Sequence, residues 1–121
     1  MDHTVLIVED ELDVRELYRD LLSDNGFNVL LATNGREGLI VARENKWDLM
    51  LLDIMLPEID GLSVLEEVKR IHKKPVLIIS NLNNDDIISR ATDLGTDGYV
   101  VKSELNPKQF IVEVKKHLNL L

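Results

Sequence analysis

Several polar side chains of this sequence stand directly after short apolar runs, and they are the residues best suited to chemistry. The set consists of Glu9, Asp10, Asp53, Ser80 and Lys102. Asp53 stands out because it interrupts the apolar stretch from Leu49 to Leu56, and Pro57 closes that stretch. A charge in apolar surroundings is costly unless it is paired. We therefore expect Asp53 to lie at the end of a strand and to face a counter-ion.

These residue types together indicate phosphoryl transfer. Three carboxylates would meet one ammonium, and each like-charge pair at about 4 Å costs about 4 kcal/mol at an effective dielectric near 20. A divalent cation relieves this repulsion, and oxygen ligands favour Mg²⁺. With Asp53 as the nucleophile, a metal on one side of a phosphoryl group and Lys102 and Ser80 on the other would give each phosphoryl oxygen a partner.

The elements that must position these residues are short strands alternating with amphipathic helices. The strands are predicted at Val5 to Val8, Asn28 to Ala32, Asp48 to Leu52, Val76 to Ile79 and Gly98 to Val101. Helices are predicted at Leu12 to Asp24, Arg36 to Glu44, Asp85 to Leu94, after Gly61 and after Asn106. Their inward faces are expected to include Leu17, Ile40 and Ile71. This alternation predicts a three-layer α/β fold whose functional groups gather beyond the carboxyl ends of parallel strands.

The totals set limits on the class of protein. A chain of 121 residues is most simply one domain, residues 1–121. The net charge of -8 argues against direct binding of nucleic acid or anionic membrane. The chain has no cysteine, no secretory signal pattern at its start, and no apolar run near the roughly 18 residues that span a bilayer. We interpret it as a cytoplasmic protein.

The polar residues and their spacing resemble the receiver domain of two-component response regulators. The similarity runs from Val5 to Leu118, and Asp53 with Pro57 and Gly61 beyond it matches the family's loop pattern. The resemblance implies a doubly wound, flavodoxin-like sheet of five parallel strands in order 2-1-3-4-5 with five helices. It also implies a protein that is not a turnover enzyme but catalyses its own aspartyl phosphorylation and dephosphorylation.

The same resemblance implies a role for each residue of the site. Asp53 would accept a phosphoryl group from a histidine kinase or phosphotransfer protein, with Lys102 and Ser80 as the other catalytic residues. The implied ligands of Mg²⁺ are Asp10, Asp53, the backbone carbonyl of Met55, and Glu9 through water. Ser80 and Tyr99 would form the conformational switch. A downstream protein would bind the face made by the fourth helix, the fifth strand and the fifth helix.

The sequence departs from the family pattern at several places. Asn81 follows Ser80 where a small residue is usual, and it could crowd the phosphate pocket or add a hydrogen bond. Ser103 replaces the proline that commonly follows the lysine, so we expect a trans peptide bond there, because a cis bond without proline costs roughly 2.5 to 4 kcal/mol. Met55 and Leu82 are apolar and would flank the attacking water in hydrolysis. We therefore hypothesise a long-lived phosphoaspartate.

Three alternatives compete with this interpretation. A phosphatase of the haloacid dehalogenase type also uses an aspartate nucleophile and Mg²⁺, but it wants a second acid two residues later, where this chain has Met55. A nucleotide or flavin binder of the same topology would need a glycine-rich or hydroxyl-rich loop after the first strand instead of Glu9 to Glu11. A receiver-like docking module that works without phosphorylation is the remaining alternative, and the intact acidic set disfavours it.

Overall fold

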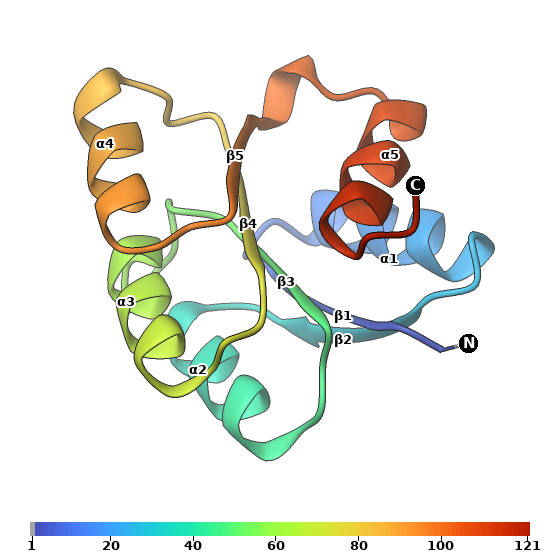
Figure 1. Ribbon diagram of the computed structural model, residues 1–121, viewed down its shortest axis with the longest axis horizontal. Coiled ribbons are helices and arrows are strands. Elements are labelled where there is room, and N and C mark those ends of the chain that lie inside the picture. The colour runs from blue at the N-terminus through green and yellow to red at the C-terminus, as the bar shows by residue number, and fades with distance from the viewer. Residues whose placement is uncertain (1) are drawn as a thin grey trace.

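The sheet at the centre of the molecule holds five parallel strands, as the computed structural model of residues 2–121 shows (Figure 1). The strands are β1 (Thr4–Val8), β2 (Asn28–Ala32), β3 (Leu49–Leu52), β4 (Val76–Ser80) and β5 (Gly98–Val101). Their spatial order is β2-β1-β3-β4-β5, and every neighbouring pair is parallel. The predicted doubly wound α/β fold with strand order 2-1-3-4-5 is confirmed.

Four α-helices connect successive strands, and a fifth follows the last strand. They are α1 (Leu12–Asp24), α2 (Gly35–Glu44), α3 (Gly61–Ile71), α4 (Asp85–Asp93) and α5 (Pro107–His117), and a short 3-10 helix, η1 (Lys102–Glu104), follows β5. The predicted boundaries agree closely with these, although β3 begins at Leu49 instead of Asp48 and α2 begins at Gly35 instead of Arg36. The helix η1 was not predicted. Within residues 2–121 no helix combines the length and apolar character needed to cross a membrane.

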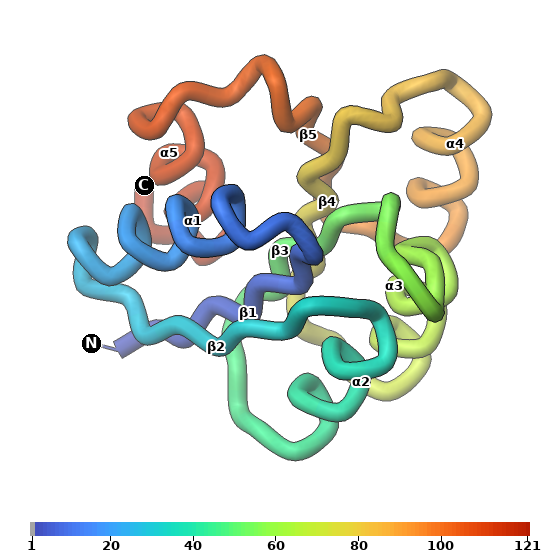
Figure 2. Tube along the Cα trace, turned by 180° about the vertical axis from the view of Figure 1, so that it is seen from behind, coloured from blue at the N-terminus to red at the C-terminus, as the bar shows by residue number. Residues whose placement is uncertain are grey.

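The helices form two layers, one on each face of the sheet. Helices α1 and α5 cover one face, and α2, α3 and α4 cover the other, as the opposite views of Figures 1 and 2 agree. Successive strand residues point to opposite faces, so Leu49 and Leu51 of β3 pack beneath α1 and α5 while Met50 and Leu52 pack against α2 and α3. Both faces of the central strands are therefore buried, and only their ends can carry polar groups.

Three residues predicted to face inward are largely exposed instead. The exposed fractions are 49% for Leu17, 39% for Ile40 and 52% for Ile71. Neighbouring helical residues are about 100° apart around the axis, and the inward positions of α1 and α2 are taken by Tyr18 and Ala42. Ile71 is the last residue of α3, at the end of its packed stripe. Apolar character alone was a wrong guide to burial at these positions.

The loop between β3 and α3 is folded tightly against the end of the sheet. The backbone N–H of Gly61 donates to the carbonyl oxygen of Ile54 at 2.9 Å. A Cβ atom at Gly61 would lie 2.4 Å from the backbone oxygen of Asp53, so only glycine permits this approach. Glu58 adopts a left-handed conformation with φ of 68° in the same loop. The start of α3 thus holds the backbone of Asp53 in place.

Candidate active site

The carboxyl ends of β1 and β3 bring Glu9 and Asp53 together. Val8 and Leu52, the last residues of these strands, are register partners, and the N–H of Asp53 donates to the carbonyl oxygen of Val8 at 3.2 Å. At the same edge, on the other side of β3, Ser80 of β4 is the register partner of Val101 of β5. Lys102 directly follows Val101 in the chain. Parallel pairing therefore brings the polar residues at the ends of four strands to one edge of the sheet; Ser80 is the last residue of β4, where the sequence had predicted the strand to end at Ile79.

The ammonium group of Lys102 lies between two buried carboxylates. Its Nζ is 2.8 Å from Oδ2 of Asp53 and 2.8 Å from Oε1 of Glu9. The exposed fractions of the side chains are 12% for Lys102, 5% for Asp53 and 3% for Glu9. Asp53 thus has the counter-ion that its position demanded.

The third carboxylate around this ammonium differs from the expected one. Glu11, an exposed residue, places Oε1 at 3.5 Å from Nζ of Lys102. Asp10 makes no ion pair with Lys102 and lies exposed at the rim of the site. Glu9 and Glu11 thus supply the side chains on either side of Asp10 that pair with Lys102.

Burial and pairing shift the pKa values of the site in definite directions. Burial raises the pKa of Glu9 above its usual 4.5, and the hydrogen bond from Lys102 only partly offsets this. Burial also acts to lower the pKa of Lys102, but the hydrogen bonds to Asp53 and Glu9 outweigh it, and the pKa is raised. Lys102 is therefore protonated at neutral pH. Ionisation of Glu9 costs more free energy in the folded protein than in the unfolded chain.

The acidic groups fit a hard divalent cation. One carboxylate oxygen from each of Glu9, Asp10 and Asp53 can be chosen so that all three atoms lie within 4.8 Å of one another. All of the donors are oxygens, and the single ammonium leaves negative charge uncompensated. The backbone of Met55 is close as well, because its N–H donates to Oδ1 of Asp53 at 3.0 Å.

A chain of hydrogen bonds connects Ser80 with Tyr99 through Leu82. The Ser80 hydroxyl is fully buried and accepts from the N–H of Leu82 at 3.2 Å. The carbonyl oxygen of Leu82 accepts from the hydroxyl of Tyr99. Burial and then the charge of Asp53 raise the pKa of Tyr99, and the Ser80 hydroxyl acts in the opposite direction. Tyr99, which is half-buried, is therefore a neutral donor at neutral pH.

Asn81 and Ser103, the two residues at which the sequence departs from the expected pattern around the site, contact each other. The N–H of Ser103 donates to Oδ1 of Asn81 at 2.8 Å, and a proline at position 103 would lack this donor. Residues 2–121 contain no cis peptide bond, so the predicted trans bond between Lys102 and Ser103 is confirmed. Of the two options for Asn81, the hydrogen bond is the one observed.

The sequence prediction did not include Arg15 among the site residues. Its Nη1 donates to the backbone carbonyl oxygens of Glu9 and Asp10 at 2.9 and 3.2 Å. The available signal was weak: an arginine one turn into the helix that follows an acidic loop. Every residue has a backbone carbonyl oxygen, so a hydrogen bond from Arg15 to such an oxygen leaves no characteristic pair of residue types in the sequence.

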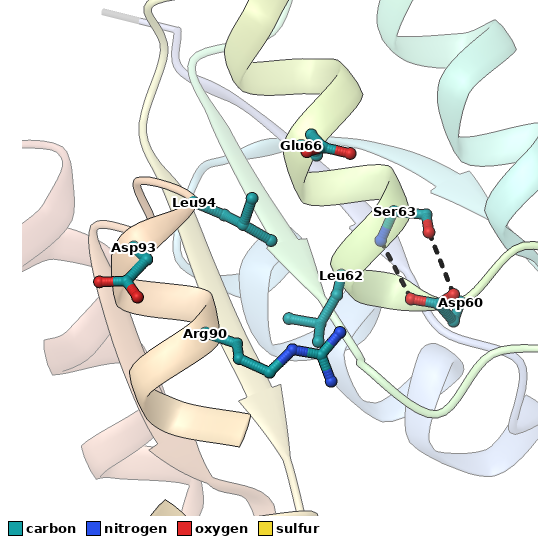
Figure 3. Close-up of a pocket in the computed structure, with 7 residues that line it drawn as sticks. All are labelled: Asp60, Leu62, Ser63, Glu66, Arg90, Asp93 and Leu94. Carbon is teal, nitrogen blue, oxygen red and sulfur yellow. Dashed lines mark hydrogen bonds between the residues drawn. The ribbon is translucent and has the colours of Figure 1, made fainter. Parts of the chain in front are cut away.

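A separate pocket opens between α3 and α4, with Arg90 reaching across it toward Leu62 (Figure 3). At its edge, Oδ1 and Oδ2 of Asp60 accept from the backbone N–H and the hydroxyl of Ser63. None of the seven predicted site residues lines this pocket. It is distinct from the cluster around Lys102.

Comparison with known proteins gives consistent matches. A family model described as the response regulator receiver domain matches residues 5–115. Regulatory protein VanRc of Enterococcus gallinarum is 31% identical over 118 residues, which cover 98% of this chain and 51% of that protein. A probable transcriptional regulator, ycf27, of Porphyra purpurea is 32% identical over 94% of this chain and 46% of its own length. The chain thus spans about half the length of these relatives.

Solved structures share the fold over nearly the whole chain. A two-component response regulator from Clostridium difficile superposes with a TM-score of 0.92 at 27% identity, covering 97% of this chain and 96% of that one. A CheY-like receiver domain protein from Methanospirillum hungatei JF-1 gives a TM-score of 0.93 at 24% identity, covering 98% and 95%. The second similarity concerns the fold alone.

The raised pKa of Glu9 predicts a pH-dependent stability of the metal-free protein. Because folding raises the pKa, Glu9 favours the folded state at low pH, and this contribution is lost as pH rises from 4.5 through the folded-state value. We expect the free energy of unfolding of the wild type, relative to Glu9→Gln, to fall over this range. Urea denaturation with a chelator present, at a series of pH values from 4.5 upward, measures it.

Glu11→Gln is the matched control, since Glu11 is exposed and meets the same ammonium. The difference between wild type and this control should not show the fall expected from a buried carboxyl group, because the Glu11 side chain is exposed. The free energy of unfolding of the wild type, relative to Glu9→Gln, could instead stay constant or grow as pH rises. Either result would contradict burial as the dominant effect on the pKa of Glu9.

Proposed function

The chain belongs to the receiver domain family of two-component response regulators, and on that premise we propose that Asp53 is its phosphoacceptor. Receiver domains of this family accept phosphoryl groups from histidine kinases. We further propose that residues 1–121 form one such domain, that the donor is a histidine kinase or phosphotransfer protein, and that a downstream protein binds the face of α4, β5 and α5.

The observation that carries the proposal is the placement of Lys102 against Asp53. The ammonium 2.8 Å from Oδ2 of Asp53 gives this buried side chain a charged hydrogen-bond partner, and an aspartate can act as the nucleophile that forms an aspartyl phosphate. In the reaction one oxygen of Asp53 forms a bond to phosphorus while the bond from phosphorus to the donor's imidazole nitrogen breaks. The electron pair of the broken bond stays on the nitrogen, and the product is an acyl phosphate.

Residues of the site have separate tasks in this transfer. Asp10, Asp53 and the backbone carbonyl of Met55 would hold Mg²⁺, with Glu9 helping through water, and the bound ion would neutralise charge on the phosphoryl oxygens. Lys102 stays beside Asp53 and pairs with another phosphoryl oxygen. Burial of Glu9, Asp53 and Lys102 excludes water and so strengthens the contacts among them.

Ser80 and Tyr99 would report phosphorylation to the downstream face. The Ser80 hydroxyl accepts from the N–H of Leu82, so its own hydrogen can bond a phosphoryl oxygen. Movement of that hydroxyl toward the phosphoryl group would release Leu82, whose carbonyl oxygen holds the hydroxyl of Tyr99. The loop before α4 and the side chain on β5 would then shift together, which favours the active population.

Intact mass after incubation with acetyl phosphate tests the proposal. We expect a gain of one phosphoryl group in the wild type with Mg²⁺, and none in Asp53→Asn or in the wild type with a chelator. If acetyl phosphate gives no gain, the purified phosphorylated kinase or phosphotransfer donor is tried next. If neither donor adds a phosphoryl group, the proposal is wrong, and a docking module that works without phosphorylation becomes the better interpretation.

The apolar side chains near Asp53 predict slow loss of the phosphoryl group. Met55 has an exposed side chain and Leu82 is half-buried, and neither carries a polar group that could orient an attacking water. We expect Met55→Asn or Leu82→Glu to speed hydrolysis of the phosphoaspartate by about tenfold, which is less than the roughly hundredfold or more of a general base, because these side chains would only orient the attacking water. Decay of the phosphorylated mass with time gives the rate.

Met55→Leu is the control for this prediction, because it changes the shape of the side chain and keeps it apolar. Its decay rate should equal that of the wild type. Equal rates in wild type, Met55→Asn and Leu82→Glu would refute the idea that these two positions govern the lifetime.

A further inference from the structure

Arg15 reaches from α1 back over the loop that carries two of the acidic residues. Its Nη1 donates to the carbonyl oxygen of Glu9 at 2.9 Å and to that of Asp10 at 3.2 Å. We infer that Arg15 is a positioning residue for the divalent cation site, since its guanidinium fixes the backbone from which both carboxylates project. The inference rests on the proposed function, because it concerns the Mg²⁺ that phosphoryl transfer would use.

Asp10 depends on its backbone far more than Glu9 does. The Glu9 carboxylate is buried and is held by Lys102 at 2.8 Å and by the N–H of Glu11 at 3.1 Å. The Asp10 carboxylate is exposed, and no residue in the range 2–121 forms a hydrogen bond or ion pair with it. The direction of the Asp10 side chain is therefore set by the backbone of its own loop.

The start of α1 lacks the capping contact that fixes the other α-helices. The residues before α2, α3, α4 and α5 each accept a hydrogen bond from a first-turn N–H through their side chains; they are Asn34, Asp60, Asn84 and Asn106. Glu11, at the same position before α1, makes no such bond. Side-chain capping is a usual restraint on the chain entering a helix, and here Arg15 supplies a restraint from within the helix instead.

The charge of Arg15 and its positioning role have opposite effects on cation binding. A guanidinium beside the acidic cluster repels a divalent cation, so loss of the charge alone would strengthen Mg²⁺ binding. Loss of the two hydrogen bonds frees the loop and so weakens binding through Asp10. The direction of the change in affinity therefore separates the two roles.

Mg²⁺ titrations of the full 121-residue chain test the inference. Wild type, Arg15→Met and Arg15→Lys are followed by the backbone amide shifts of the acidic loop in NMR spectra. We expect the apparent Kd for Mg²⁺ to rise about tenfold in Arg15→Met, as for residues that orient metal ligands from behind. Arg15→Lys, which keeps the charge and can still donate, should recover part of the affinity.

Arg19→Met is the matched control. Arg19 lies one turn further along the same helix and, among residues 2–121, pairs only with the exposed Asp20, so its loss removes the same charge without touching the loop. Its Kd should equal that of the wild type or fall slightly. The dispersion of the metal-free spectra establishes that each variant is folded.

The outcomes distinguish this inference from the proposed function. Saturable binding by the wild type with an equal or lower Kd in Arg15→Met overturns the positioning role and leaves the proposed function intact. An equal rise in Kd for Arg15→Met and Arg19→Met also overturns it, since the effect would not depend on the loop contacts. Absence of saturable binding by the wild type overturns the proposed metal site and this inference with it.

Discussion

The ammonium of Lys102 between Glu9 and Asp53 is the interaction on which the rest of the site depends. Without it, two buried carboxylates would lie side by side with no counter-charge, and removal of one partner from a buried pair typically costs about 3 to 5 kcal/mol. The three residues follow β5, β1 and β3, so their contact requires the parallel sheet with β1 beside β3. The parallel strand order is thus what allows Lys102 to neutralise both buried carboxylates.

Two cationic side chains serve this arrangement in different ways. Lys102 acts through its charge, directly on the carboxylates. Arg15 acts through geometry, since it contacts backbone oxygens of the loop and not the acids themselves. The hydrogen bond between Asn81 and Ser103 adds a further restraint, because it ties the residue after Lys102 to the loop after β4. Together these contacts hold the loops around Asp53, the proposed phosphoacceptor.

The strand ends were predictable because an acid or a lysine after an apolar run has few stable places in a parallel sheet. Asp53 and Lys102 were identified in this way, and the structure brings them together. Helix faces were less predictable, as Ile40 shows, because apolar character does not say which of two neighbouring positions meets the sheet. Contacts with backbone oxygens, such as those of Arg15, depend on loop geometry that residue types do not encode.

The most direct test of the account asks which atom of the protein carries the phosphoryl group. Borohydride reduces an acyl phosphate to an alcohol, so treatment of the phosphorylated protein should convert the modified aspartate to homoserine. Peptide mapping by mass spectrometry then locates it. The account predicts homoserine at position 53 and at no other acid. Conversion at Asp10 or another carboxylate, or a phosphorylated protein that yields no homoserine, would contradict the assignment of Asp53 as the nucleophile paired with Lys102.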